Sequence, residues 1–255
     1  MILIVAALEE ELRTATDCWG EVRRLPGTDL PLWCAQAASE QPVAFLRSGV
    51  GPKKSAARLN AALERVSPEL VLVAGYAGAL DPGLRVGDLV AVARATPFRL
   101  GGVSPDWDHV EAGRPFDLDA AALVTVAEAA GLAVAQGGAL SSKHVLGNPV
   151  HKGLLFRRFQ ASVVDMETAF LVREAASRGI PAAALRVVSD TAQDDFLEAF
   201  ERDSAVGLAA RARKLVRGNP ASAWRTWREN AAKAQGVLRR FWKAYRERCC
   251  GHAAN

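Results

Sequence analysis

The sequence is poor in the residues that build disulfide frameworks and metal centres. Its 255 residues include only four cysteines and four histidines. The cysteines form no CxxC pair, and the histidines show no spacing that would complete a zinc site. We therefore expect reduced thiols, no bound metal and no other cofactor. These absences argue against a disulfide-rich secreted domain and against a zinc enzyme.

The sequence also lacks a hydrophobic run long enough to cross a bilayer. Its apolar N-terminus has no basic leader and meets three glutamates rather than a cleavage site, so we expect a cytoplasmic protein. A dinucleotide fingerprint is missing as well. Neither residues 48–51 (SGVG) nor the stretch with Gly75 and Gly78 gives GxGxxG with an acid about 20 residues later.

What the sequence does contain is an alternation of apolar runs with helix-like segments. Half of the residues are hydrophobic, which is ample for one large core. The Gly- and Pro-rich segment Thr96–Pro115 is predicted to be a long loop. The alternation predicts an α/β architecture with a mostly parallel central sheet. Strands are predicted at 1–8, 42–47, 69–74, 86–93, 133–140, 160–164 and 182–188, and helices at 9–17, 52–66, 117–130, 165–178 and 194–216.

Acidic side chains follow three of the predicted strands. The first strand runs into a group of glutamates that ends at Glu11, a later strand runs into Asp165 and Glu167, and the last runs into Ser189 and Asp190. Ligands bind at the carboxyl ends of the strands in an open parallel sheet. These acids are therefore candidates for acid–base chemistry or for hydrogen bonds to a ligand. The alternative is structural, because acids suit the first turn of a helix and Ser or Asp caps one.

Four motifs, in their order and spacing, are similar to those of one family. They are residues 73–80 (VAGYAGAL), 84–90 (LRVGDLV), 164–169 (VDMETA) and 185–190 (LRVVSD). Together they resemble the nucleoside phosphorylase and nucleosidase family, which includes methylthioadenosine/S-adenosylhomocysteine nucleosidase. The resemblance implies a single-domain, three-layer α/β fold with a central mixed β-sheet flanked by helices. It also implies a homo-oligomer, a dimer or higher, that cleaves the N-glycosidic bond of a small-molecule nucleoside.

The resemblance also implies a role for individual residues. Asp190 would be the acid at purine N7, Glu167 would hold the ribose hydroxyls, and Glu11 would activate water. Met166 would pack under the sugar, and Arg186 would help to hold the nucleophile side of the site. Further substrate contacts are expected from Gly75, Tyr76, Ala77 and Ser189.

These residue types fit glycosidic cleavage. A purine leaves poorly unless N7 is protonated, so a carboxyl group whose pKa is raised by burial is useful there. A carboxylate beside the sugar stabilises the positive charge that develops at C1′. The related hexameric phosphorylases hold phosphate with an Arg and a Ser at the positions of Val73 and Tyr76. Water is therefore the expected nucleophile, and Asp190, rather than an Asn, favours adenine within the family.

Three alternatives stay open. The enzyme could be phosphorolytic, or the chain could be a noncatalytic nucleoside-binding protein. It could also release adenine from a lipid-linked nucleoside at a membrane surface. Residues 78–84 and 164–167 resemble, about as well as any, a branch of the family that removes adenine from adenosylhopane in hopanoid synthesis.

Beyond residue 217 the family pattern ends and the charge changes sign. The whole chain has a net charge of +4, but residues 211–255 hold twelve Lys and Arg against two Glu. That segment therefore carries +10, which leaves −6 for the remainder. We divide the chain into a catalytic domain, 1–217, and a basic helical tail, 218–255.

The tail has the pattern of an amphipathic helix with an aromatic seam. The seam could pack on the body of the protein or on a second copy. It could instead lie at an anionic membrane surface, which would make the protein peripheral to the inner membrane face. Nucleic acid is not expected, because an aromatic stripe of this kind is badly placed to stack on bases. At alternating spacings of three and four, the seam residues are Trp224, Trp227, Ala231, Ala234, Leu238, Phe241 and Tyr245.

Overall fold

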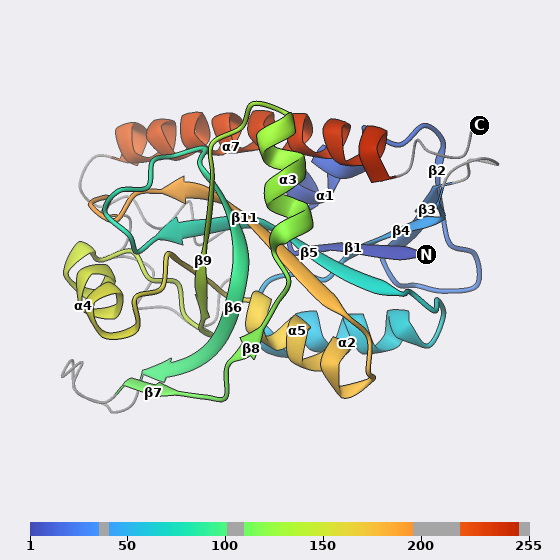
Figure 1. Cartoon of the computed structure of the whole chain (residues 1–255), viewed down its shortest axis with the longest axis horizontal. Coiled ribbons are helices and arrows are strands. Elements are labelled where there is room, and N and C mark those ends of the chain that lie inside the picture. Colours follow the sequence, from blue (N-terminus) through green and yellow to red (C-terminus); the bar gives the residue numbers. More distant parts are fainter. Residues whose placement is uncertain (36–40, 101–109, 196–219, 250–255) are drawn as a thin grey trace.

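The computed structural model describes residues 1–35, 41–100, 110–195 and 220–249 (Figure 1). The strands are β1 (Ile2–Ala6), β2 (Val22–Arg24), β3 (Leu32–Ala35), β4 (Val43–Arg47), β5 (Leu70–Ala79), β6 (Leu89–Leu100), β7 (Val110–Ala112), β8 (Phe116–Asp117), β9 (Val134–Ser141), β10 (Val163–Asp165) and β11 (Ala182–Asp190). The helices are α1 (Glu9–Thr16), α2 (Pro52–Leu63), α3 (Ala121–Ala129), α4 (Pro149–Phe159), α5 (Thr168–Ser177) and α7 (Pro220–Cys249).

The described strands form one mixed sheet, in the order β10-β9-β6-β11-β5-β1-β4-β3-β2, with β7 and β8 paired to β6. Strand β10 also pairs with β5, antiparallel, so five strands close into a ring. The register sets Val164 of β10 and Asp190 of β11 on either side of Gly78 in β5. The expected α/β fold with a mixed central sheet is confirmed.

Helices cover both faces of the sheet and complete the three layers. Helices α1, α3 and α7 lie on one face, whereas α2 and α5 lie on the other (Figure 1). Each face has its own apolar cluster, because alternate side chains of the central strands point to opposite sides. In β5, for example, Leu72 joins one cluster and Val73 joins the other.

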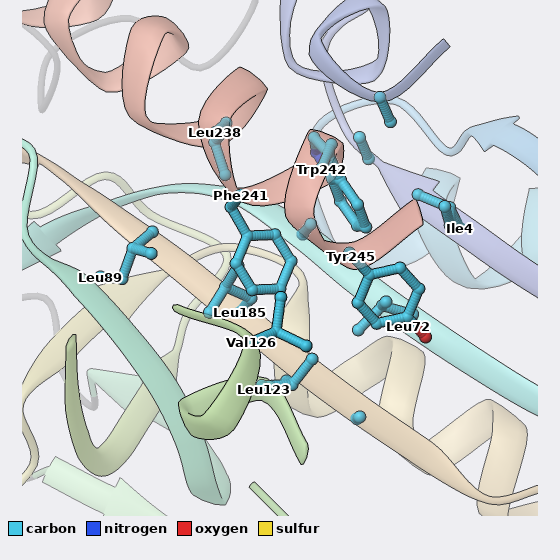
Figure 2. Packing of buried hydrophobic residues seen from close by; sticks show 14 of the residues in the cluster. Ile4, Leu72, Leu89, Leu123, Val126, Leu185, Leu238, Phe241, Trp242 and Tyr245 are labelled. Carbon is cyan, nitrogen blue, oxygen red and sulfur yellow. The ribbon is translucent and has the colours of Figure 1, made fainter. Parts of the chain in front are cut away.

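Helix α7 buries its apolar face in the first of these clusters. Figure 2 shows Leu238, Phe241, Trp242 and Tyr245 directed onto the sheet and α3. The ring of Trp242 meets Trp19 edge to face, with 6.0 Å between the centroids. The seam predicted from the sequence is therefore buried on the protein over its described part, and Trp242 belongs to it too. The side chains of Trp224 and Trp227 lie outside the described residues.

The structure corrects the expectation for Thr96–Pro115. This segment is not a continuous loop, because β6 runs on to Leu100 and pairs with β7 at Val110–Ala112. Phe98 is 2% exposed and gives the strand an apolar anchor that the local Gly and Pro content conceals. Residues 101–109 lie outside the described part.

Strands β2, β3, β7 and β8 and helix α4 were not predicted. The helix expected over 194–216 falls almost wholly outside the described residues, and residues 194 and 195 are not helical. Among the described residues, no helix is both long and apolar enough to span a membrane. Within the same residues, no group of three or more His, Cys, Asp and Glu side chains could bind a metal ion.

We expect the contact between α7 and the sheet to contribute substantially to stability. Phe241 is 0% exposed, so Phe241→Ala should lower the free energy of unfolding by about 3–5 kcal/mol through lost burial and a cavity. Lys243→Ala, on the exposed side of the same helix, is the control and should change it by less than about 0.5 kcal/mol. Urea denaturation measures both free energies of unfolding. A loss in Phe241→Ala as small as that in Lys243→Ala would show that the packing of α7 does not stabilise the fold.

Candidate active site

Glu11 is the one buried member of the three glutamates that begin α1, with 5% of its surface exposed. Its Oε2 accepts a hydrogen bond of 2.7 Å from the Leu8 N–H, and its Oε1 accepts one of 2.8 Å from the Tyr76 N–H. Burial nevertheless raises the pKa of Glu11 from 4.5 to about 7, because desolvation outweighs these bonds and the attraction of Arg186. A carboxyl group that titrates near neutrality suits a general base.

Gly75 of β5 makes room for this arrangement. A Cβ at this position would lie 2.6 Å from Glu11 Oε1 and 2.8 Å from Arg186 Nη1. Such contacts are too short for a real side chain. The glycine therefore permits the carboxyl group and the guanidinium to approach the same point of the strand.

Glu167 follows β10 and is 6% exposed. Its Oε1 accepts a hydrogen bond of 2.7 Å from the Gly51 N–H, at the start of α2. Desolvation first, and then the negative charge of Asp165, raise the pKa of Glu167 to about 8. Arg186 opposes this shift and Glu11 adds to it, so the two glutamates and the arginine share one electrostatic environment.

Arg186 is 1% exposed and binds together segments that are distant in the sequence. Its Nη2 lies 2.7 Å from Asp165 Oδ2, although without the alignment of a good hydrogen bond. Its Nε donates to Thr168 Oγ1 at 2.8 Å, and its Nη1 donates to the Tyr76 carbonyl at 3.4 Å. Asp165 also accepts from the Ser141 hydroxyl at 2.5 Å. This network fixes the end of β10, which carries Glu167, against β11 and β5.

Asp190 ends β11, and its side chain is 17% exposed. Its Oδ2 lies 2.6 Å from Nζ of Lys152, and its Oδ1 accepts from the Ser189 hydroxyl at 2.8 Å. A Cβ on Gly78 would lie 2.7 Å from Oδ2, so this second glycine makes room for the second acid. Asp190 is therefore paired with a buried cation, which the sequence did not predict.

Lys152 was missed from the sequence, together with its helix α4. The helix itself carries a recognisable start signal. The side chain of Asn148 accepts from the Val150 N–H, and Pro149 stands at the first helical position. Nothing in the local pattern, however, marks the lysine as buried.

The remaining predicted contact residues lie on the same strand ends. Met166 is half-buried between Asp165 and Glu167, and the buried Ala77 accepts from the Ser189 hydroxyl at 3.3 Å. The ring of Tyr76 is partly buried and packs toward the α1, α3 and α7 side of the sheet. Desolvation, and then Glu11, raise the pKa of this phenol, whose buried hydroxyl lies beside Gln235 of α7 without a well-formed hydrogen bond.

The structure thus groups the predicted residues along a short stretch of β5. Glu11 and Arg186 meet the strand at Gly75, and Asp190 meets it at Gly78. Three residues of strand separate these points by roughly 10 Å. The roles of the individual side chains stay predictions.

Comparisons with known proteins show the family and the fold. Residues 1–218 match the family model described as the phosphorylase superfamily. The fold is similar to that of 5′-methylthioadenosine/S-adenosylhomocysteine nucleosidase from Neisseria meningitidis in complex with methylthio-immucillin-A. The TM-score is 0.68 at 19% identity, over 95% of this chain and 98% of that one.

Two proteins from Helicobacter pylori have similar folds. The 5′-methylthioadenosine/S-adenosylhomocysteine nucleosidase, with butyl-thio-DADMe-immucillin-A, has a TM-score of 0.70 at 17% identity, over 94% of this chain and 96% of that one. Futalosine hydrolase has a TM-score of 0.68 at 17% identity, with the same coverage. At these identities the likeness is one of fold, whereas the family model covers most of the sequence. The chain belongs to the phosphorylase superfamily.

Proposed function

We propose that this protein is a hydrolase that cleaves the N-glycosidic bond of a purine nucleoside and releases adenine. The observation that carries the proposal is the buried Glu11, held by backbone N–H groups and with a pKa of about 7, in the same electrostatic environment as a second buried acid, Glu167. The similar structures support it, since they are nucleosidases bound to nucleoside analogues and a futalosine hydrolase.

In the proposed reaction, Asp190 gives a proton to purine N7 while the bond to the sugar breaks. Glu167 binds the ribose hydroxyls, and its negative charge stabilises the cation that forms at C1′. Glu11 takes a proton from the attacking water. The electron pair of the broken bond stays on the purine, and the hydroxyl group of the water joins C1′.

Water is the favoured nucleophile because Arg186 already serves other partners. Its guanidinium is shared by Asp165, Thr168 and the carbonyl of Tyr76. A phosphate dianion in this place would compete with those interactions. Phosphorolysis remains the alternative that the assays below separate from hydrolysis.

The proposal includes a homo-oligomer, on the family resemblance alone, and a cytoplasmic location. The membrane alternative is supported by charge, whereas the described part of the aromatic seam of α7 is buried on the protein. Exposed basic residues of the helix could still meet an anionic surface. They include Arg228, Lys233, Arg239, Arg240, Lys243 and Arg248.

Purified protein should release adenine from adenosine or methylthioadenosine at the same rate with and without phosphate. Glu11→Gln should lower kcat by at least about 10²-fold, because the amide cannot accept the proton of water. Glu10→Gln is the matched control, since it removes the neighbouring carboxylate and should retain activity within about 2-fold. Adenine is measured by chromatography. Formation of ribose 1-phosphate would refute hydrolysis. If no nucleoside, including a lipid-linked one, released its base, the protein would instead be a noncatalytic nucleoside-binding protein.

The rate should fall in acid over the range in which Glu11 and Glu167 titrate. Their pKa values of about 7 and about 8 belong to an interacting pair, so kcat/KM should decline as the pH drops from about 8 to below 7. Protonated Glu11 cannot act as a base, which gives the sign. The charge of Glu10 helps to raise the pKa of Glu11, so Glu10→Gln should shift the acidic decline of kcat/KM to lower pH. A profile that stays flat down to pH 5 would contradict the assignment of Glu11.

Gly75→Ala should impair catalysis more than folding. The added methyl group would collide with Glu11 Oε1 and Arg186 Nη1, so the carboxyl group must move, and we expect kcat to drop by about 10²-fold. Gly131→Ala offers a control on a turn where a Cβ would meet nothing within 4 Å, although its φ of +62° adds some strain there. Steady-state kinetics with thermal unfolding separates the two effects. Equal activity in Gly75→Ala and wild type would mean that Glu11 is not confined by β5.

A further inference from the structure

Lys152 is a buried lysine for which the proposed mechanism has no role. Its side chain is 0% exposed, and lysine is almost never fully buried unless it is paired. It comes from α4 and reaches the end of β11, where Nζ lies 2.6 Å from Asp190 Oδ2. Asp190 is the side chain assigned to the purine base, so the lysine acts on the site through that acid.

The ammonium group of Lys152 is surrounded by hydrogen-bond acceptors. Nζ donates to Asp190 Oδ2 at 2.6 Å and to the Thr191 carbonyl at 2.7 Å, with the Asp194 carbonyl at 3.5 Å. These three acceptors match the three protons of an ammonium group. The turn that supplies the carbonyls is itself fixed, because the Thr191 N–H donates to Asp194 Oδ2 at 2.7 Å.

Fold stability alone is a weak reason for this pair. Removing a lysine from water costs free energy, and a buried ion pair is often no more stabilising than apolar residues of the same size.

The second oxygen of Asp190, Oδ1, can be made available to a ligand. The single hydroxyl proton of Ser189 has two acceptors, Asp190 Oδ1 at 2.8 Å and the Ala77 carbonyl at 3.3 Å. When Ser189 turns to Ala77, Oδ1 is released while Lys152 still holds Oδ2.

We propose that Lys152 is the positioning residue of Asp190 and the source of the proton that Asp190 passes to the purine; this inference rests on the proposed function. A carboxylate in an ion pair has no proton to give until one reaches it. Lys152 gives one proton to the Asp190 carboxylate, and the resulting carboxylic acid gives one to N7 as the bond between C1′ and the purine breaks. Asp190 is again a carboxylate, and Lys152 is left as a neutral amine.

The protons balance over the whole cycle. The attacking water loses a proton to Glu11, and the bond electrons leave with the purine, which N7 protonation neutralises. After the products depart, Glu11 returns its proton to solvent and Lys152 regains one. The neutral amine keeps two N–H groups, which suffice for Asp190 and the Thr191 carbonyl.

The test compares two leaving groups in Lys152→Met and Lys152→Arg. Adenosine needs protonation of its base, whereas 4-nitrophenyl β-D-ribofuranoside releases a stable anion without it. Methionine removes the charge. Arginine keeps the charge but does not give up its proton, so it separates attraction from proton supply. Lys243→Met on the exposed face of α7 is the control, and thermal unfolding checks that each variant is folded.

Both Lys152 variants should lose about 10²-fold in kcat on adenosine, with KM little changed, and less than about 3-fold on the nitrophenyl riboside. Equal losses on the two substrates, or no loss on adenosine, would overturn the inference. Full activity in Lys152→Arg alone would reduce the lysine to a charge partner and also overturn proton supply. If Lys152→Met does not fold, the two rates of Lys152→Arg test the inference. If adenosine is not cleaved, methylthioadenosine takes its place in the comparison, and wild-type protein that releases adenine from no nucleoside would instead reject the proposed function.

Discussion

The antiparallel pairing of β5 with β10 is the constraint on which the site depends. Strand β10 is four pairings away from β5 along the sheet, and only closure of the ring brings them together. This closure carries Glu167 to the neighbourhood of Glu11 and places both around β5. Gly75 and Gly78 then leave room for side chains that a Cβ would exclude. Backbone geometry thus positions the acids before any ligand binds.

The electrostatics follow from that closure. Arg186 faces Glu11, Asp165 and Glu167, so one guanidinium serves three buried carboxyl groups. Desolvation is then only partly compensated, and the pKa values of Glu11 and Glu167 rise to about 7 and about 8. Asp165 has the ion pair and several hydrogen bonds, whereas the two glutamates receive mostly backbone N–H groups. The site therefore holds exchangeable protons near neutral pH.

The sequence predicts the parts of this arrangement that have a local pattern. Apolar runs that end in acids mark the ends of β1, β10 and β11. This pattern does not choose among the three glutamates after β1; the family resemblance selects Glu11, which is the buried one. The pairing of β5 with β10 has no such pattern, because it joins segments about 85 residues apart. The burial of Lys152 cannot be predicted from the sequence for the same reason. Asn148 and Pro149 indicate the start of a helix, but tertiary packing alone brings its fourth residue, Lys152, to Asp190.

Helix α7 shows how composition can mislead about where an element belongs. Its basic residues set it apart from the acidic body, and the family model ends at residue 218. Yet Phe241 and Trp242 fill the apolar face formed by β1, β5 and β11, and aromatic side chains of this size dominate core energetics. Gln235 of the same helix lies beside the hydroxyl of Tyr76, whose N–H holds Glu11. The helix therefore covers the residue that positions the proposed base, and its packing and the geometry of the site are physically linked.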